Sequence, residues 1–238
     1  MDVMAKNDLS EIYHRQTILD MVGADGQYKI CNAKVLVVGA GGLGSPLIQY
    51  IVAVGVGNIG IMDNDTVAIH NLHRQVLYNY MQIGKSKVEC AKEYAEKLNP
   101  NCKALIYPFR LTDDNAFDIF KEYDIVVDCS DNLLTRYIID KYTQKLGIPF
   151  VYGSLCEFKG KVAIFNYRGG VSYSDIYPFD EVDIGNFVQS NGIIGAFAGI
   201  VGTIEALEVI KLILGIPTLT DKIMLIDGLT LSFDTIRL

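Results

Sequence analysis

The order of apolar and polar residues divides the chain into strands and helices in alternation. Apolar runs of strand length occur five times, at 35–40, 58–63, 103–109, 124–132 and 148–155. Segments with helical spacing lie between them, at 47–56, 86–100, 115–123 and 133–147. Strands that alternate with helices predict a mostly parallel sheet covered by helices. Pro108, inside one of these runs, predicts that its strand lies at an edge of the sheet.

From Gly160 onward the pattern changes. The segments 161–167 and 223–238 are bounded by turn signals and predict antiparallel strands. Residues 172–192 are polar and aromatic without clear periodicity, which is typical of a functional loop or of a disordered segment. The tyrosines and phenylalanines of this segment leave two alternatives open, a grip on an extended peptide or an ordinary surface loop.

The long apolar stretch at 192–215 predicts a buried helix. It contains Glu205, Glu208 and Lys211, each of which would be costly inside a bilayer. No break in composition divides the chain, so residues 1–238 are predicted to form a single domain. The expected fold class is α/β, with a twisted, mostly parallel sheet, helices on both faces, and antiparallel strands in the C-terminal part.

Composition narrows the function classes. Half of the 238 residues are hydrophobic and 21% are charged, as in ordinary globular proteins. The net charge of −7, without a run of basic residues, argues against a nucleic-acid partner. Five cysteines, none in a C-x-x-C pair, fit a reducing compartment. The first residues lack the apolar core of a signal peptide, so a cytoplasmic protein without a membrane anchor is expected.

A glycine motif follows the first predicted strand. Gly39, Gly41 and Gly44 match G-x-G-x-x-G, which opens the first helix of Rossmann-like nucleotide-binding folds. Such a turn allows close approach to phosphate at a helix N-terminus, and Asp63 at the end of the next strand can hydrogen-bond a ribose. Alone, this motif favours a nicotinamide or flavin enzyme.

Charged residues beyond Asp65 change this interpretation. Arg74 in "HNLHRQ" and Lys87 in "GKSK" bring cations beside the nucleotide pocket, which a triphosphate needs more than a dinucleotide does. Asp131 and Asn132 follow a strand, where open α/β sheets bind ligands. A carboxylate at this position is a plausible Mg²⁺ ligand beside phosphates and water.

The motifs "YHRQ", "GAGGLGSP", "MDNDTV", "HNLHRQ", "GKSKVE", "DCSDN" and "LIDG" occur in one order from Tyr13 to the C-terminus. In this order and spacing the chain resembles the HesA/MoeB/ThiF family of ubiquitin-activating-enzyme-like adenylyltransferases. The resemblance implies a homodimer that uses Mg²⁺ and ATP. It also implies a partner, a small ubiquitin-like sulfur-carrier protein whose C-terminal Gly-Gly carboxylate is adenylated. Thiamine, molybdopterin and other sulfur-transfer pathways all remain open.

The resemblance also assigns roles to single residues. Gly39, Gly41 and Gly42 form the phosphate turn, and Asp63 and Asp65 lie at the nucleotide. Asn71, Arg74 and Lys87 contact phosphates. Asp131 positions Mg²⁺, and Asn132 lines the same pocket. Arg15 reaches the active site of the other subunit. From residue type alone, Asp65 and Asp128 could be metal ligands but are more simply explained as strand-end carboxylates or caps. Lys85 is explained as a solvated residue at a helix start, and Lys87 fits the family position better.

The chain departs from the family in its cysteines. Relatives in thiamine and molybdopterin synthesis carry two C-x-x-C pairs for zinc, but Ser172, Ser174 and Asp175 stand at the first position and the chain ends before the second. No zinc is therefore expected. Val188 stands near the loop cysteine of many relatives, which leaves open whether enzyme and carrier form a covalent intermediate. Cys129 is predicted to face the core rather than to act as a nucleophile.

Two rival functions remain at this stage. A nicotinamide-dependent oxidoreductase would leave Arg74, Lys87 and Asp131 without a role. A non-catalytic subunit of a heterodimeric activator of ubiquitin-like proteins would be expected to have lost part of this residue set, which here is present in full.

Overall fold

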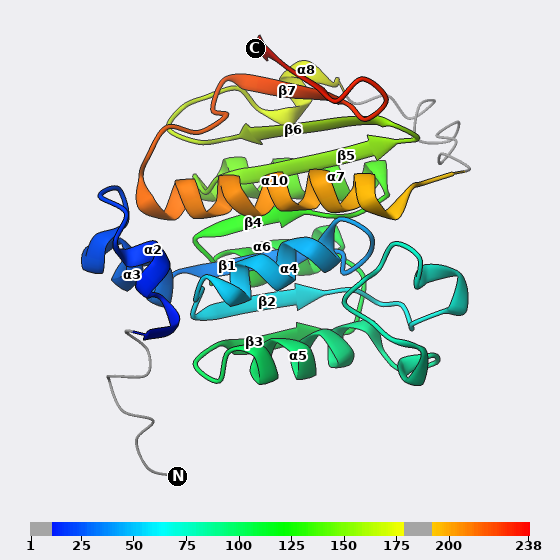
Figure 1. The fold of residues 1–238 in the computed structure, drawn as a ribbon. Coiled ribbons are helices and arrows are strands. Elements are labelled where there is room, and N and C mark those ends of the chain that lie inside the picture. The colour runs from blue at the N-terminus through cyan, green and yellow to red at the C-terminus, as the bar shows by residue number, and fades with distance from the viewer. Residues whose placement is uncertain (1–10, 179–191) are drawn as a thin grey trace.

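The computed structural model describes residues 11–178 and 192–238. Their strands form one eight-stranded sheet in the order β3-β2-β1-β4-β5-β6-β7-β8 (Figure 1). The strands are β1 (Lys34–Val38), β2 (Asn58–Met62), β3 (Lys103–Tyr107), β4 (Ile125–Asp128), β5 (Phe150–Cys156), β6 (Lys159–Phe165), β7 (Lys222–Asp227) and β8 (Ser232–Arg237). The described helices are α2 (His14–Thr17), α3 (Gly23–Asn32), α4 (Gly44–Ala53), α5 (Lys87–Leu98), α6 (Asp113–Phe120), α7 (Leu133–Leu146), α8 (Tyr173–Ile176) and α10 (Gly195–Leu214), with 3-10 turns η1 (Ile69–Asn71) and η2 (Tyr80–Gln82).

The sheet changes character at β5. Strands β1 to β5 pair in parallel, whereas β5–β6, β6–β7 and β7–β8 pair antiparallel. The strand order reverses at β1, which has β2 on one side and β4 on the other. Open α/β sheets bind ligands at such a reversal, outside the carboxyl ends of the strands. The fold therefore directs attention to the loops that follow β1, β2 and β4.

Helices cover the parallel strands on both faces. In Figure 1, α4, α5 and α10 lie on the near face and α6 and α7 behind. Alternate residues of β1 enter the two cores: Val35 and Val37 pack on the side of α4 and α10, and Leu36 and Val38 on the other side. α10 packs closely on α4 because Gly202 has no side chain to meet the Leu43 carbonyl. Within the described ranges, no helix is long and apolar enough to cross a bilayer.

The predicted α/β architecture is confirmed, with a few changed boundaries. The strand predicted at 124–132 is too long, because β4 ends at Asp128 and the next residues turn toward α7. β3 is an edge strand as predicted, although it ends before Pro108. The segment predicted to be loop contains the short helix α8. Residues 179–191, including Val188, lie outside the described part of the chain.

Candidate functional site

The glycine turn joins β1 to α4. Gly39 has a φ of +100°, which disfavours any side chain, and a Cβ there would lie 2.6 Å from the Cys129 carbonyl oxygen. The backbone that follows β4 thus lies directly against the turn. The turn leads into the N-terminus of the ten-residue α4, whose dipole favours a negative group.

Asp63 closes this turn from the side of β2. Its Oδ2 accepts a hydrogen bond from the Ala40 N–H at 2.8 Å, and its Oδ1 accepts one from the Asp65 N–H at 2.8 Å. An ionised carboxylate has about four acceptor positions. Asp63 is only half-buried, so it can both fix the turn and accept a ribose hydroxyl.

Lys87 begins α5 and is unusual for a lysine, because only 4% of it is exposed. Its Nζ donates to the Asp65 carboxylate at 2.9 Å, while the Asp65 side chain is 60% exposed. Asp65 thereby holds a buried cation at the carboxyl edge of the sheet. Lys85, two residues earlier, is exposed, as its assignment to a solvated helix start predicts.

The segment after β2 brings Arg74 to the glycine turn. Asn71 is buried and its Oδ1 accepts a hydrogen bond from the Ala68 N–H at 3.0 Å, which shapes the 3-10 turn η1. The Arg74 side chain passes 3.8 Å from the place of a Cβ on Gly42. Its Nη1 donates to the His70 carbonyl at 2.9 Å and lies 2.8 Å from the His73 ring.

Asp131 and Asn132 lie between β4 and α7. Asn132 is the N-cap of α7, and its Oδ1 accepts a hydrogen bond from the Thr135 N–H at 3.2 Å. Asp131 is exposed. The Cys129 N–H donates to the Val38 carbonyl at 2.8 Å, so this loop and the glycine turn are adjacent. Cys129 itself is buried in the core, as predicted, and burial raises the pKa of its thiol.

The sequence interpretation missed a buried network beneath this loop. Asp128 is fully buried, and its carboxylate accepts from Arg136 Nε at 3.1 Å and from the Ser130 N–H at 2.9 Å. Burial raises the pKa of Asp128, an effect that Arg136 and Ser130 oppose. The sequence signal for the Asp128–Arg136 pair is an acid at the end of a predicted strand, followed by an arginine in the first turn of the next helix. Gln75 was also missed: it is buried beside Gly41, and its Oε1 has no hydrogen-bond partner among the described residues.

Arg15 is the one predicted site residue that lies apart from the others. Arg15 is exposed on α2. The next residue of this helix, Gln16, donates a hydrogen bond at 2.8 Å to the carbonyl of Val54, which follows the end of α4. Tyr13 accepts a hydrogen bond from Asn99, beyond the end of α5, at 2.8 Å. In Figure 1, α2 accordingly lies at the edge where the parallel strands begin, opposite the loops that carry the other residues.

Asp131 supplies one carboxylate, which is the kind of ligand that Mg²⁺ takes beside phosphates and water. Among residues 11–178 and 192–238, no three His, Cys, Asp or Glu side chains converge as a metal cluster. Mg²⁺ fits such a site, because it takes one or two carboxylates and completes its shell with phosphate oxygens and water. At the position of the first zinc pair, Ser172 and Asp175 instead form a capping box for α8. Asp140 accepts hydrogen bonds from the Tyr173 and Ser174 N–H groups, which anchors this turn.

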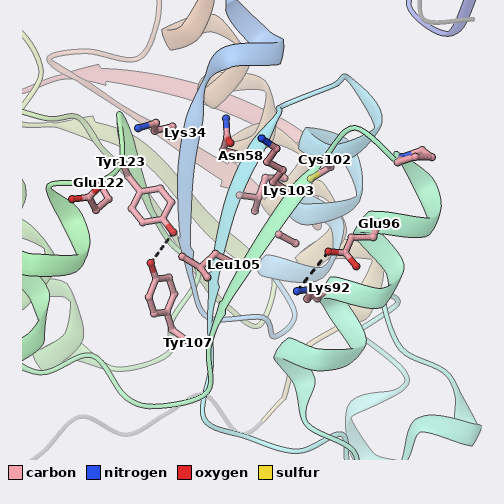
Figure 2. Close-up of a pocket in the computed structure, with 13 residues that line it drawn as sticks. Lys34, Asn58, Lys92, Glu96, Cys102, Lys103, Leu105, Tyr107, Glu122 and Tyr123 are labelled. Atoms are coloured by element: carbon pink, nitrogen blue, oxygen red, sulfur yellow. Dashed lines mark hydrogen bonds and ion pairs between the residues drawn. The ribbon is translucent and has the colours of Figure 1, made fainter. Parts of the chain in front are cut away.

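A hollow of about 720 Å³ lies along the edge strand β3, and Figure 2 shows the residues that line it. Lys34, Asn58 and Lys103 line it at the beginnings of three strands, and Tyr107 and Tyr123 are joined by their hydroxyls at 2.9 Å. It contains none of the predicted site residues. Apart from Arg15, the predicted site residues lie instead at the opposite ends of the parallel strands, the carboxyl ends. We assign the candidate site to these ends.

Comparisons with curated proteins find relatives that match most of the chain. The chain is 44% identical over 209 residues to the adenylyltransferase and sulfurtransferase UBA4 of Kluyveromyces lactis, covering 87% of this chain and 47% of that protein. It is 41% identical over 229 residues to the sulfur carrier protein adenylyltransferase of Thermus thermophilus, covering 93% and 84%. The chain thus spans about half the length of the curated relatives that head the comparison.

A solved structure shares the fold. The microcin C7 biosynthetic enzyme MccB in complex with N-formylated MccA superposes with a TM-score of 0.84 at 20% identity, covering 99% of this chain and 74% of that one. The model of the ThiF family matches residues 13–238, nearly the whole chain. The protein therefore belongs to the ThiF family.

Proposed function

We propose that this chain uses Mg²⁺ and ATP to adenylate the C-terminal carboxylate of a ubiquitin-like sulfur-carrier protein. One observation carries the proposal: the glycine turn at Gly39 lies against the loop that bears Asp131. Phosphates at the start of α4 would then lie beside Arg74 and the loop of Asp131, and Lys87 is linked to the same turn through Asp65 and Asp63. The names of the 41–44% identical relatives support the same reaction and the same class of partner.

The reaction needs charge stabilisation and no side-chain nucleophile. A carrier carboxylate oxygen attacks the α-phosphorus of ATP, the bond between that phosphorus and the bridging oxygen breaks, and pyrophosphate leaves. Lys87 and Arg74 offset the negative charge that grows on the departing phosphates. Asp63 holds the ribose end, and Asp131 would hold Mg²⁺, which would supply neutralisation of phosphate charge.

A cavity of about 610 Å³ next to Asn132 suits the carrier's extended tail. Leu133 and Arg136 of α7 line one end of this cavity, Tyr152 and Lys161 line it from β5 and β6, and Tyr177 lines it from the end of α8. Lys161 Nζ lies 5.3 Å from the Tyr177 ring. Aromatic walls and cations suit a peptide that ends in a carboxylate.

Arg15 supports the further proposal of a homodimer. On its own chain it lies at the wrong edge of the sheet for the site, so only a second copy can bring it to ATP. Apolar side chains beside it are exposed by more than half, as expected of a surface that a partner covers: Ile12, Ile18, Leu19 and Met21.

The proposed reaction is tested by ATP–pyrophosphate exchange with a panel of carriers that end in Gly-Gly. Exchange should depend on both Mg²⁺ and the carrier, and a carrier without its final glycine should support none. Absence of exchange with every carrier would overturn the proposed function.

The dimer is tested by mixing Arg15→Ala and Asp131→Ala proteins, each nearly inactive alone. Random subunit exchange should restore roughly a quarter of wild-type activity, because half the dimers are mixed and each has one intact site. Proven exchange without recovery would show that Arg15 does not act across subunits.

A further inference from the structure

The Asp128–Arg136 pair lies directly beneath the loop that carries Asp131, and neither residue belongs to the proposed nucleotide contacts. Asp128 is fully buried at the end of β4, and Arg136, in the first turn of α7, is 7% exposed. Two buried charges are costly to desolvate, and replacing such a pair with apolar residues is often neutral or stabilising. Stability alone is therefore a weak explanation for its presence.

The pair fastens Ser130 on three sides. Asp128 Oδ1 accepts from the Ser130 N–H at 2.9 Å and from its hydroxyl at 2.5 Å. Arg136 Nη2 donates to the Ser130 carbonyl at 3.3 Å. The Arg136 guanidinium lies 5.3 Å from the centre of the Tyr152 ring, which fixes it from below.

Asp131 consequently stands between two fixed residues. Ser130 is held by the buried pair, and Asn132 is held as the N-cap of α7 by its bond to the Thr135 N–H. On the other side, the Cys129 carbonyl abuts Gly39. The hydrogen bonds of Asp128, Arg136 and Ser130 thus set the position of the Asp131 backbone relative to the glycine turn.

We infer that Asp128 and Arg136 are positioning residues, which fix Asp131 through Ser130 and so determine how strongly Mg²⁺ and ATP bind together. The inference rests on the proposed function, because it takes Asp131 as the Mg²⁺ ligand. Groups that orient a metal ligand through a hydrogen bond change metal affinity about 10- to 100-fold when removed.

The test compares Arg136→Lys with Glu208→Gln as a matched control. Lysine keeps the charge but loses the planar fork that contacts Asp128 and Ser130 together. Glu208 is an equally buried carboxylate, paired with Lys211 and accepting from the Leu219 N–H at 2.8 Å, but it lies far along α10. Both variants should lose stability, whereas only Arg136→Lys should change the response to Mg²⁺.

Calorimetry of ATP binding with and without Mg²⁺ gives a readout that does not require turnover. For Arg136→Lys, the gain in ATP affinity that Mg²⁺ provides should fall at least about tenfold, with metal-free affinity nearly unchanged. In the Asp131→Asn background, adding Arg136→Lys should cause no further loss, since both changes act on one ligand. Ser130→Ala keeps the ion pair of Asp128 and Arg136, so the gain in ATP affinity that Mg²⁺ provides should fall by only about threefold. This variant replaces Arg136→Lys in the test if Arg136→Lys does not fold.

An unchanged Mg²⁺ contribution in folded Arg136→Lys or Ser130→Ala protein would overturn the inference, as would equal losses in Glu208→Gln. These outcomes are separate from failure of the proposed function. Wild-type protein that couples Mg²⁺ to ATP but supports no pyrophosphate exchange would contradict the carrier reaction and leave the positioning role standing.

Discussion

The parallel and antiparallel parts of the sheet differ in where they leave polar side chains accessible. In β1 every residue after Lys34 is buried, whereas in β8 every residue after Ser232 is exposed. Strands covered on both faces have no room for chemistry along their length, so it collects in the loops at their ends. An antiparallel strand with one open face can present side chains to another protein. The comparison shows that accessible side chains gather at the ends of the parallel strands and along the antiparallel ones, as the proposed separation of nucleotide and carrier sites requires.

The largest effect should follow from a charge change at the nucleotide edge. Lys87→Ala should lower the rate of pyrophosphate exchange at saturating carrier by at least about a hundredfold, because a charge that stabilises the leaving group is lost. Lys161→Ala, in the antiparallel part, should raise the KM for the carrier by about tenfold or less and leave that rate nearly unchanged. Steady-state exchange kinetics measure both values. A Lys87→Ala enzyme with wild-type exchange would break the distinction.

The strand β5, where the parallel and antiparallel parts of the sheet meet, should not tolerate a larger side chain at Gly153. β5 belongs to both, and a methyl group on Gly153 would overlap the carboxyl of Glu205 from α10. Gly153→Ala should therefore lower the free energy of unfolding by about 2 kcal/mol or more.

The control for this change is Gly199→Ala on α10, the helix that carries Glu205. Nothing lies within 4 Å of a Cβ added at Gly199. It should raise stability by up to about 1 kcal/mol, because alanine favours helix over glycine. Urea unfolding compares the two variants. Equal midpoints would show that α10 shifts freely over β5.

Glu205 should make stability fall with rising pH. Burial, with a further contribution from Asp128, raises the pKa of this carboxyl well above its usual value, and its Oε2 has no partner among the described residues. Above the unfolded pKa of about 4.3, the native state keeps a proton that the unfolded state releases. The free energy of unfolding should thus drop by up to about 1.4 kcal/mol per pH unit until the folded pKa is reached.

Glu205→Gln has no proton to lose and should flatten this slope between pH 5 and 8. Asp128, whose pKa is also raised by burial, and its partner Arg136 remain, so part of the slope should persist. Cys129 titrates above that range. Urea midpoints at four pH values measure the difference, and parallel profiles for wild type and variant would refute the assignment.

The smallest effect concerns metal in the antiparallel part. Asp140 and the Ser172–Asp175 capping box hold the turn where the family resemblance places the first C-x-x-C pair. A zinc chelator should leave the melting temperature unchanged, and metal analysis should find far less than one zinc per chain. A chelator-dependent drop in melting temperature would show that a ligand set had been overlooked.

The apolar pattern was enough to predict a mostly parallel sheet, because strands buried on both faces are continuous apolar runs, but the order of the strands comes from the structure. It failed at the end of β4, where Asp128 is as buried as the valines before it only because Arg136 neutralises it. Contacts between residues far apart in sequence were equally hidden. Neither the pairing of Lys87 with Asp65 nor the remote edge occupied by Arg15 can be inferred from spacing, since both depend on how helices pack.

The close seating of α10 on α4 bears on how a cell makes this protein. A ribosome that has released the first 150 residues has produced the nucleotide edge, but α10 is still to be translated. Until then the face of α4 that α10 covers has no partner, and Leu47 and Ile48 belong to the same core cluster as Phe197 and Val201 of α10. A chain that lacks α10 therefore exposes hydrophobic surface, which makes it prone to aggregation during synthesis. We expect nascent chains to depend on a chaperone over this interval, and chains truncated before α10 to accumulate as aggregates.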